Sequence, residues 1–132
     1  MVIPSNAVGL GPHIAMDLYI LNQGLVKLGY YTSDYMSPLV INDIMRLSNE
    51  GPGKMTMPCE IWQSPDNKTT LLVMRTGTES GKARHFADEL VNFTVAQGFS
   101  NVVVLTSTIS PVKRGRDTNG DIPELYAYIN NF

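Results

Sequence analysis

Residues 8–31 read VGLGPHIAMDLYILNQGLVKLGYY, and this stretch predicts a turn and then a long helix. The glycines come before Pro12, which suits the first turn of a helix because its nitrogen needs no hydrogen-bond partner there. Apolar residues then recur in steps of four and three, the spacing of an amphipathic helix that buries one face. These residues are Ile14, Leu18, Leu21, Leu25 and Leu28. Gly29 predicts the end of the helix.

Strands are expected on both sides of this helix. Val2–Pro4 is a short apolar segment that predicts a strand before the turn, and the aromatic segment Gly29–Ser33 predicts one after the helix. Leu39–Ile41 is a further candidate strand. The glycine- and proline-containing stretch Ser48–Lys54 predicts a loop that divides the two halves of one domain.

The centre of the chain has the pattern of a hairpin. Met55–Gln63 and Thr69–Thr76 are candidate strands, and Ser64–Asn67 between them has the composition of a turn. We therefore expect two antiparallel strands, with Trp62 packed on one face of the sheet.

A second helix and a buried strand complete the predicted domain. Ser80–Gln97 has helical spacing of its apolar residues and is followed by Gly98 as a stop. Asn101–Leu105 is an unbroken apolar run, which predicts a strand covered on both faces in a parallel sheet. The tail Asp121–Phe132 starts a candidate third helix at Pro123. This order predicts a single α/β layered domain over residues 1–132.

Composition argues against several classes of function. The 132 residues are 43% apolar and 17% charged, as in ordinary globular domains. The net charge of -2 provides no overall positive field for nucleic acid. A secretory signal and an apolar run long enough to span a membrane are both missing from the sequence, so we expect a soluble, reducing compartment. Cys59 is the single cysteine and is expected to be a small buried hydrophobe.

Motifs for catalysis or cofactor binding fail on inspection. Gly77–Ala83 lies between a predicted strand and helix, but its glycines are one residue too close for a phosphate-binding P-loop, and Ala83 replaces the hydroxyl that would hold magnesium. His13 and His85 have no second histidine or cysteine nearby, so no metal site is predicted. We expect no cofactor and no enzymatic activity.

Several segments match, in order and spacing, the pattern of one known family. The first match covers the loop and the helix, with Val8, Gly9, Ile14, Ala15, Met16 and Asp17. It continues through Leu28–Tyr31, Asp34 and Pro38–Val40. Looser matches follow at Glu60–Trp62, Leu72–Arg75 and Val102–Ser107. On these residues the chain resembles the proteasome assembly chaperone 2 family.

The resemblance implies a fold and a role. The implied fold is a three-layer α/β sandwich with a mixed central sheet, similar to purine nucleoside phosphorylases. The implied role is that of a chaperone which pairs with a related first chaperone and promotes assembly of the α-subunit ring of the core proteasome. The implied location is the cytoplasm, with the nucleus as a second possibility.

Two departures from the family pattern stand out. Leu10 replaces the asparagine of the family's loop. Members of the family are about twice as long, and some end in a hydrophobic-Tyr-any tripeptide that docks between α subunits, whereas this sequence ends in Asn130–Phe132. The sequence therefore corresponds to an N-terminal part or to a shortened homologue.

Two alternatives remain open from the sequence. One is a nucleoside-phosphorylase-like or other small-ligand enzyme, because a fold alone does not exclude activity. The other is a structural module of an unrelated complex. For partner binding the candidates are the aromatic residues Tyr30, Tyr31 and Tyr35, because tyrosine is enriched at interface hot spots. The competing interpretation is that these three tyrosines belong to the core.

Overall fold

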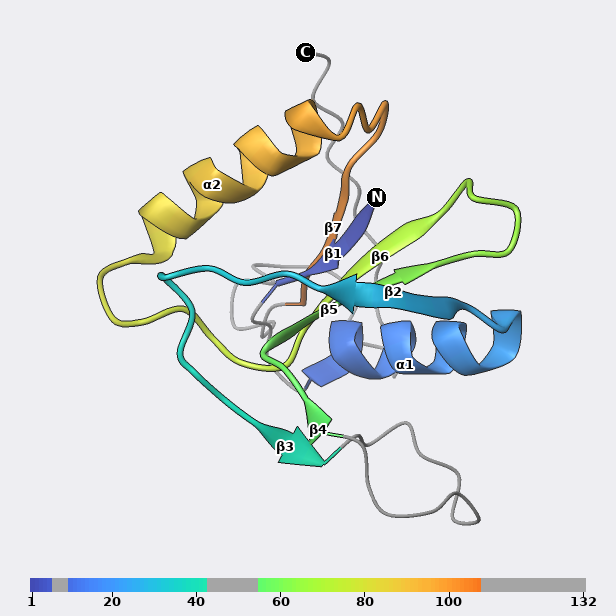
Figure 1. The fold of residues 1–132 in the computed structure, drawn as a ribbon, viewed down its shortest axis with the longest axis horizontal. Coiled ribbons are helices and arrows are strands. Elements are labelled where there is room, and N and C mark those ends of the chain that lie inside the picture. The colour runs from blue at the N-terminus through green and yellow to red at the C-terminus, as the bar shows by residue number, and fades with distance from the viewer. Residues whose placement is uncertain (6–9, 43–54, 108–132) are drawn as a thin grey trace, which may run out of the picture.

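The structure, a computed structural model, describes residues 1–5, 10–42 and 55–107. Seven strands and two helices lie within these residues (Figure 1). In chain order they are β1 (Val2–Pro4), α1 (Gly11–Gln23), β2 (Val26–Tyr30), β3 (Ile41–Asn42), β4 (Met55–Thr56), β5 (Cys59–Gln63), β6 (Thr70–Met74), α2 (Ala83–Ala96) and β7 (Val103–Leu105).

Five of the strands form one mixed sheet in the order β2-β5-β6-β1-β7. β1 is parallel to both β6 and β7, whereas β5 is antiparallel to β2 and β6. β3 and β4 form a separate two-stranded sheet, which lies below the main sheet in Figure 1. The predicted mixed α/β sheet is confirmed; the similarity to nucleoside phosphorylases stays a prediction.

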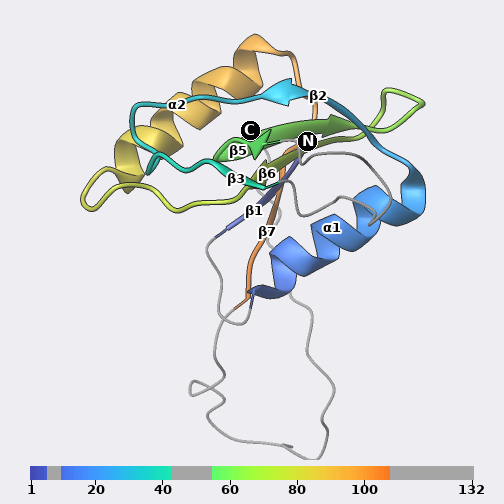
Figure 2. The same cartoon turned by 60° about the horizontal axis from the view of Figure 1, so that its bottom comes forward.

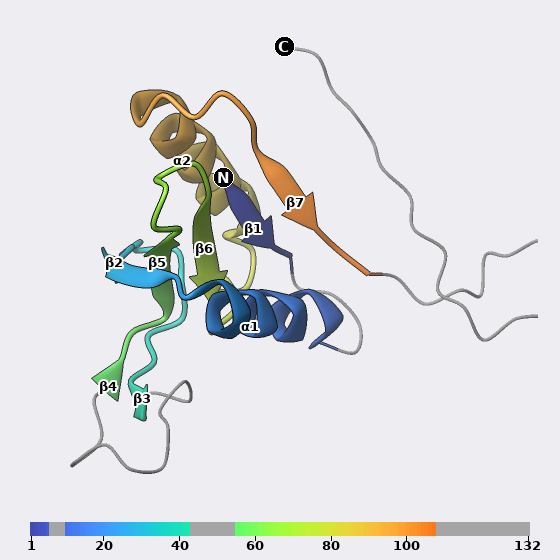
Figure 3. The same cartoon turned by 90° about the vertical axis from the view of Figure 1, so that its right-hand side faces the viewer.

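The two helices cover opposite faces of the main sheet, which gives three layers (Figures 2 and 3). Successive strand residues point to opposite faces, and the core divides accordingly. On the α1 side, Met16 and Ile20 pack with Trp62 and Leu71. A second cluster on the α2 side joins Phe86 to buried residues of the strands and loops, among them Met1, Ile3, Tyr31, Cys59, Leu72 and Met74.

The predicted hairpin is confirmed. β5 and β6 pair antiparallel from Cys59 opposite Met74 to Gln63 opposite Thr70. The connecting turn is closed by the Ser64 N–H, which donates to the Thr69 carbonyl over 2.9 Å. Trp62 is buried on one face, as expected, and Cys59 is fully buried.

The predicted end of the first helix is wrong. α1 stops at Gln23 because Gly24 adopts a left-handed conformation with φ of 61°, and its N–H donates to the Ile20 carbonyl. β2 then begins at Val26, so Leu28 and Gly29 lie in a strand. Both Gly24 and Gly29 could end a helix, and the sequence spacing favoured the later one.

The predicted buried face of this helix is also wrong. The inward positions are Pro12, Met16 and Ile20, which recur every fourth residue. Ile14, Leu18 and Leu21 lie on the opposite side of the helix, and each is more than half exposed. The helix is therefore apolar on two faces, and only one of them meets the sheet.

The last described strand is parallel, as predicted, but it is not covered. Among the described strands, β7 pairs with β1 alone and forms an edge of the sheet. Val103 and Val104 point to opposite faces, and both are about half exposed. The prediction that both faces of this strand are buried is wrong for the described part of the chain.

The remaining expectations are met in part. α2 is shorter than the predicted Ser80–Gln97, and Gly98, with φ of 68°, follows it. The candidate strand Leu39–Ile41 overlaps β3 only at Ile41. Val8 and Gly9, the loop Ser48–Lys54 and the third helix at Pro123 lie outside the described residues.

Candidate functional site

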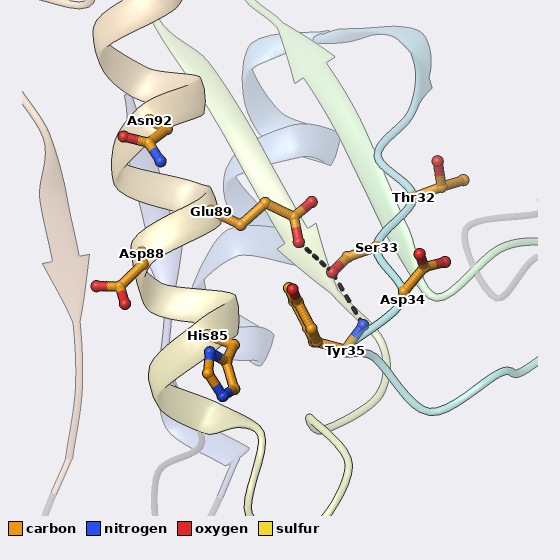
Figure 4. A pocket seen from close by; sticks show the side chains of 8 residues that line it. All are labelled: Thr32, Ser33, Asp34, Tyr35, His85, Asp88, Glu89 and Asn92. Carbon is orange, nitrogen blue, oxygen red and sulfur yellow. Dashed lines mark hydrogen bonds between the residues drawn. The ribbon is translucent and has the colours of Figure 1, made fainter.

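A cavity of about 670 Å³ opens beside α2 (Figure 4). One wall is the loop that follows β2, and the other is the exposed side of the helix. The lining residues are Thr32, Ser33, Asp34, Tyr35, His85, Asp88, Glu89 and Asn92. Three of them are carboxylates and none is a lysine or arginine, so we refer to this cavity as the acidic pocket.

Backbone hydrogen bonds set the path of the loop. After β2 the chain stays against β5, because the Tyr31 N–H donates to the Cys59 carbonyl over 3.0 Å. Further on, Ser37 and Glu79 donate their N–H groups to the carbonyls of Gly77 and Tyr35. The loop is therefore held between β5 and the segment that leads into α2.

Glu89 joins the two walls of the acidic pocket. Its Oε1 accepts the Tyr31 hydroxyl at 2.8 Å and its Oε2 accepts the Ser33 hydroxyl at 2.6 Å. Figure 4 shows Glu89 reaching from α2 across to Ser33, whose oxygen also accepts the Tyr35 N–H. Since both carboxylate oxygens are engaged, Glu89 holds the loop against the helix.

Tyr31 keeps its hydroxyl proton in this arrangement. Burial raises the pKa of the phenol far above its usual value, and the hydrogen bond to Glu89 and the charge of that carboxylate raise it further. Its ring packs edge-on against Phe93 at a centroid distance of 5.0 Å. Tyr31 is thus a core residue whose hydroxyl contacts Glu89 of the acidic pocket.

The structure does not bring the three predicted tyrosines together. Tyr30 is 43% exposed on β2, where the Lys27 ammonium lies 5.6 Å from its ring. Tyr31 is buried on the other face of the sheet. Tyr35 lines the acidic pocket, and its ring lies 5.6 Å from that of His85. Their role in binding a partner stays a prediction, for which Tyr30 and Tyr35 are accessible.

The segment tested as a phosphate loop forms an ordinary turn before α2. Gly81 has φ of 77°, and the Lys82 N–H donates to the Glu79 carbonyl at 3.0 Å. The Lys82 ammonium pairs with the Glu79 carboxylate at 3.1 Å. The lysine charge is therefore already paired within the turn.

The chemistry of the acidic pocket favours a cation or a hydrogen-bond donor as its ligand. Three carboxylates, with no arginine or lysine among the lining residues, favour ammonium or guanidinium groups over phosphate. Within residues 1–5, 10–42 and 55–107, no three His, Cys, Asp or Glu side chains are placed to hold a metal ion.

A buried charge cluster on the α1 side of the sheet was missed by sequence reasoning. Glu60 is only 1% exposed, and its carboxylate pairs with the Lys27 ammonium at 2.5 Å and with the Arg75 guanidinium at 3.1 Å. Thr56 and Trp62 also donate to this carboxylate. Arg75 in turn pairs with Asp17 of α1 at 2.9 Å.

The pKa of Glu60 reflects this setting. Burial alone would raise it, but the hydrogen bonds from Lys27 and Thr56 and the positive charges of Arg75 and Lys27 outweigh burial. The net effect lowers the pKa of Glu60, so this carboxylate is ionised at neutral pH. We refer to Asp17, Lys27, Glu60 and Arg75 as the charge cluster; it joins α1, β2, β5 and the end of β6.

The fold and these features define an α/β sandwich domain with an open acidic pocket and a charge cluster inside the sandwich. The chain belongs to the PAC2 family, whose sequence profile matches residues 1–128. The family resemblance inferred from the sequence is thereby confirmed.

Curated relatives of the chain carry the name proteasome assembly chaperone 2. The chain is 27% identical over 110 residues to proteasome assembly chaperone 2 of Bos taurus, which covers 83% of this chain and 42% of that protein. The human protein of the same name is 26% identical, again over 83% of this chain and 42% of that protein. In Nematostella vectensis the identity is 23%, over 81% of this chain and 45% of the relative. The chain thus spans less than half the length of these curated relatives.

Among the described residues no helix is both long and apolar enough to cross a bilayer.

Proposed function

We propose that this chain acts as a proteasome assembly chaperone, a binding protein without turnover. The observation that supports the proposal is the family match over residues 1–128, together with relatives named proteasome assembly chaperone 2 that align with 83% of the chain. In this proposal the chain pairs with a related first chaperone and promotes assembly of the α-subunit ring. It works in the cytoplasm, with the nucleus as an alternative location.

The acidic pocket is the surface that we propose for contact with an α subunit. Its carboxylates would receive lysine or arginine side chains, and the accessible Tyr35 would add an aromatic contact. Rim charges of this kind mainly speed association and select the partner.

The test is a pull-down of purified α subunits and the related chaperone by the tagged chain, followed by native gels for ring intermediates. We expect retention of α subunits and faster ring formation. Asp34→Asn removes one charge from the acidic pocket and should weaken retention several-fold. Asp66→Asn makes the same change on the exposed β5–β6 turn and should leave retention unchanged. Failure to retain any α subunit would contradict the proposal.

An enzyme related to nucleoside phosphorylases is the competing proposal. It requires a phosphate site, which the carboxylates of the acidic pocket oppose and which the Lys82–Glu79 pair does not supply. Calorimetric titration with phosphate and a purine nucleoside decides the point. Heat of binding at micromolar to millimolar ligand would favour the enzyme.

A further inference from the structure

A second, smaller cavity adjoins the acidic pocket. Its volume is about 170 Å³, and it lies where the loop after β2 meets the residues between β4 and β5. Thr32 and Ser33 line both cavities, so these two residues form the wall between them. The other lining residues are apolar or aromatic, and we refer to the space that they enclose as the apolar cavity. They are Tyr31, Met36, Pro38, Met57 and Pro58.

The apolar cavity has the size and the lining of a site for one side chain. A cavity of about 150 Å³ with apolar walls holds a molecule of the size of benzene. The apolar cavity is slightly larger, so it accommodates a leucine or phenylalanine side chain. Met36 is buried, whereas Met57 is 36% exposed. Methionine side chains are flexible and fill irregular gaps, so these walls can adjust to the side chain that enters.

The acidic pocket on the other side of the wall has two carboxylates that no described residue engages. Both oxygens of Glu89 already accept the hydroxyls of Tyr31 and Ser33. Asp34 lies on the loop and Asp88 on α2, on opposite walls of the pocket (Figure 4). Within the described residues neither of these two carboxylates has a hydrogen-bond or ion-pair partner. A lysine or arginine side chain that enters between the walls would therefore find a free carboxylate.

One segment of polypeptide can occupy both cavities, because they share a wall. In an extended segment, side chains two positions apart point to the same side and are about 7 Å apart. We propose that the acidic pocket and the apolar cavity form one site for an extended segment of an α subunit. This segment has a lysine or arginine two positions from a leucine or phenylalanine. The inference rests on the proposed function, because it takes the bound protein to be the one that the chain helps to assemble.

The kind of contact favours an α subunit over the related chaperone. A chaperone must release the subunits that it assembles, and contacts that are made and broken are small and more polar. A lasting pair of chaperones would instead bury a larger, more apolar surface. Two side chains in two small cavities, one of them held by charge, fit a subunit that is bound and released. Membrane surfaces and nucleic acids present phosphates, which the free carboxylates disfavour.

The chain's own basic run Lys113–Arg116 begins on the far side of the sheet. It follows β7, and β7 and β2 are opposite edges of the five-stranded sheet. Four strand spacings place these edges about 19 Å apart. The stretch from Ser107 to Lys113 spans at most about 22 Å when fully extended. Lys113 would need an almost straight path to the acidic pocket, although α2 covers this face of the sheet (Figures 2 and 3).

Short peptides test the site on the purified chain by nuclear magnetic resonance. The probe is an acetylated and amidated Gly-Leu-Ser-Arg-Gly peptide, and two matched peptides replace its leucine by serine or its arginine by glutamine. The probe should shift the amide signals of Asp34 and Tyr35 in one cavity and of Met57 in the other. Each matched peptide should bind about fivefold more weakly or worse. Shifts in one cavity alone, or equal affinities, would overturn the two-cavity site.

A change at one methionine tests the apolar cavity. Met57→Glu puts a carboxylate into it, so affinity for the probe should fall about tenfold. A peptide with lysine in place of the leucine should then bind more tightly than the probe. Met55→Glu makes the same change at the 67% exposed Met55 of β4, outside both cavities, and should leave these affinities within about twofold. Circular dichroism melts check that both variants fold, and an unchanged peptide preference in Met57→Glu would overturn the assignment.

The probe also identifies the occupant. In a pull-down with purified α subunits and the related chaperone, excess probe should release the α subunits and leave the chaperone bound. Release of the chaperone instead, or of neither protein, would overturn the assignment to an α subunit. Tighter probe binding by the triple variant Arg46→Ser/Lys113→Ser/Arg114→Ser would also overturn it, because the chain's own basic residues would then occupy the site. Absence of α-subunit binding without probe contradicts the proposed function, whereas probe binding to the chain alone would still support the two-cavity site.

Discussion

Replacing Arg75 tests how much the fold depends on the charge cluster. The Arg75 side chain is 5% exposed and bonds to Glu60 through Nε and Nη2 and to Asp17 through Nη1. Arg75→Met keeps a long apolar side chain but removes the charge and the donors. Removal of one partner from a buried ion pair typically costs about 3–5 kcal/mol, because the other charge stays buried.

The contacts that remain place the expected loss near the lower limit. Glu60 keeps Lys27 and the Thr56 hydroxyl, so its charge is still partly compensated. Asp17 is partly exposed and can turn to water, so losing its partner should add less than about 1 kcal/mol. We therefore expect Arg75→Met to lower the free energy of unfolding by about 3 kcal/mol.

Urea unfolding followed by tryptophan fluorescence measures this loss. Trp62 is the only tryptophan, it is buried, and its indole donates to Glu60, so it reports directly on the cluster. With a typical urea dependence for a domain of this size, the midpoint should fall by about 1–3 M. As a control, Lys82→Met breaks the exposed Lys82–Glu79 pair and should cost less than about 1 kcal/mol.

A double variant separates loss of a charge pair from loss of packing. Glu60→Met leaves Arg75 with Asp17 and removes the carboxylate that pairs with Lys27. Arg75→Met/Glu60→Met removes both buried charges. Its loss of unfolding free energy should therefore be smaller, by about 1 kcal/mol or more, than the sum of the losses of the two single variants. A loss below about 1 kcal/mol for Arg75→Met, or additive losses, would refute the reasoning.

Four further predictions follow from other contacts. The pKa of Glu60 is lowered in the folded state, so its contribution to stability is present above the usual carboxylate pKa of 4.5 and is lost as pH falls through the lower pKa of the folded state. Urea melts at a series of pH values should show this loss, and in Arg75→Met the loss should occur at higher pH. Tyr31→Phe removes the hydroxyl that donates to Glu89 and should lower the free energy of unfolding by about 1 kcal/mol in the same melts. An unchanged free energy of unfolding would contradict this hydrogen bond. Gly24→Ala meets no atom within 4 Å, so its cost of about 1 kcal/mol should come from the positive φ alone, whereas Gly11→Ala, in open space without a positive φ, should not destabilise the chain. Burial raises the pKa of the Cys59 thiol to about 12, so a thiol reagent at pH 8 should label the chain only at the rate of unfolding, and rapid labelling of the folded chain would contradict the described core.

Local sequence signals predicted the parts of the fold that depend on neighbouring residues. The β5–β6 hairpin followed from two strand-like runs around Ser64–Asn67, and the hydrogen bonds that close its turn join residues within 64–69. α2 followed from its apolar spacing and from Gly98. The residues within these elements indicate where each element starts and ends and which of its faces is buried.

Contacts between distant residues could not be predicted in this way. α1 has two sets of apolar residues at helical spacing, and the sequence alone does not say which one meets a sheet. The apolar run of β7 has the composition of a central strand, but its place in the sheet depends on which strands lie beside it. The acidic pocket joins Ser33 to Glu89, 56 residues apart, and no short motif marks such a pair.

The charge cluster provides a physical reason why α1 faces the way it does. Burial of Met16 and Ile20 or of Ile14 and Leu18 would remove similar amounts of apolar surface from water, so the hydrophobic effect distinguishes the two orientations poorly. Asp17 lies beside the inward face, and only this orientation lets it pair with the nearly buried Arg75.

Turning the helix over would expose Asp17 and leave Arg75 with Glu60 alone. We infer that the charge cluster fixes the orientation of α1 and so keeps Ile14 and Leu18 on the outside. Hydrogen exchange on Arg75→Met tests the inference, because the amides of α1 should lose more protection than those of α2. Equal losses in both helices would mean that the cluster stabilises the domain as a whole without selecting a face of the helix.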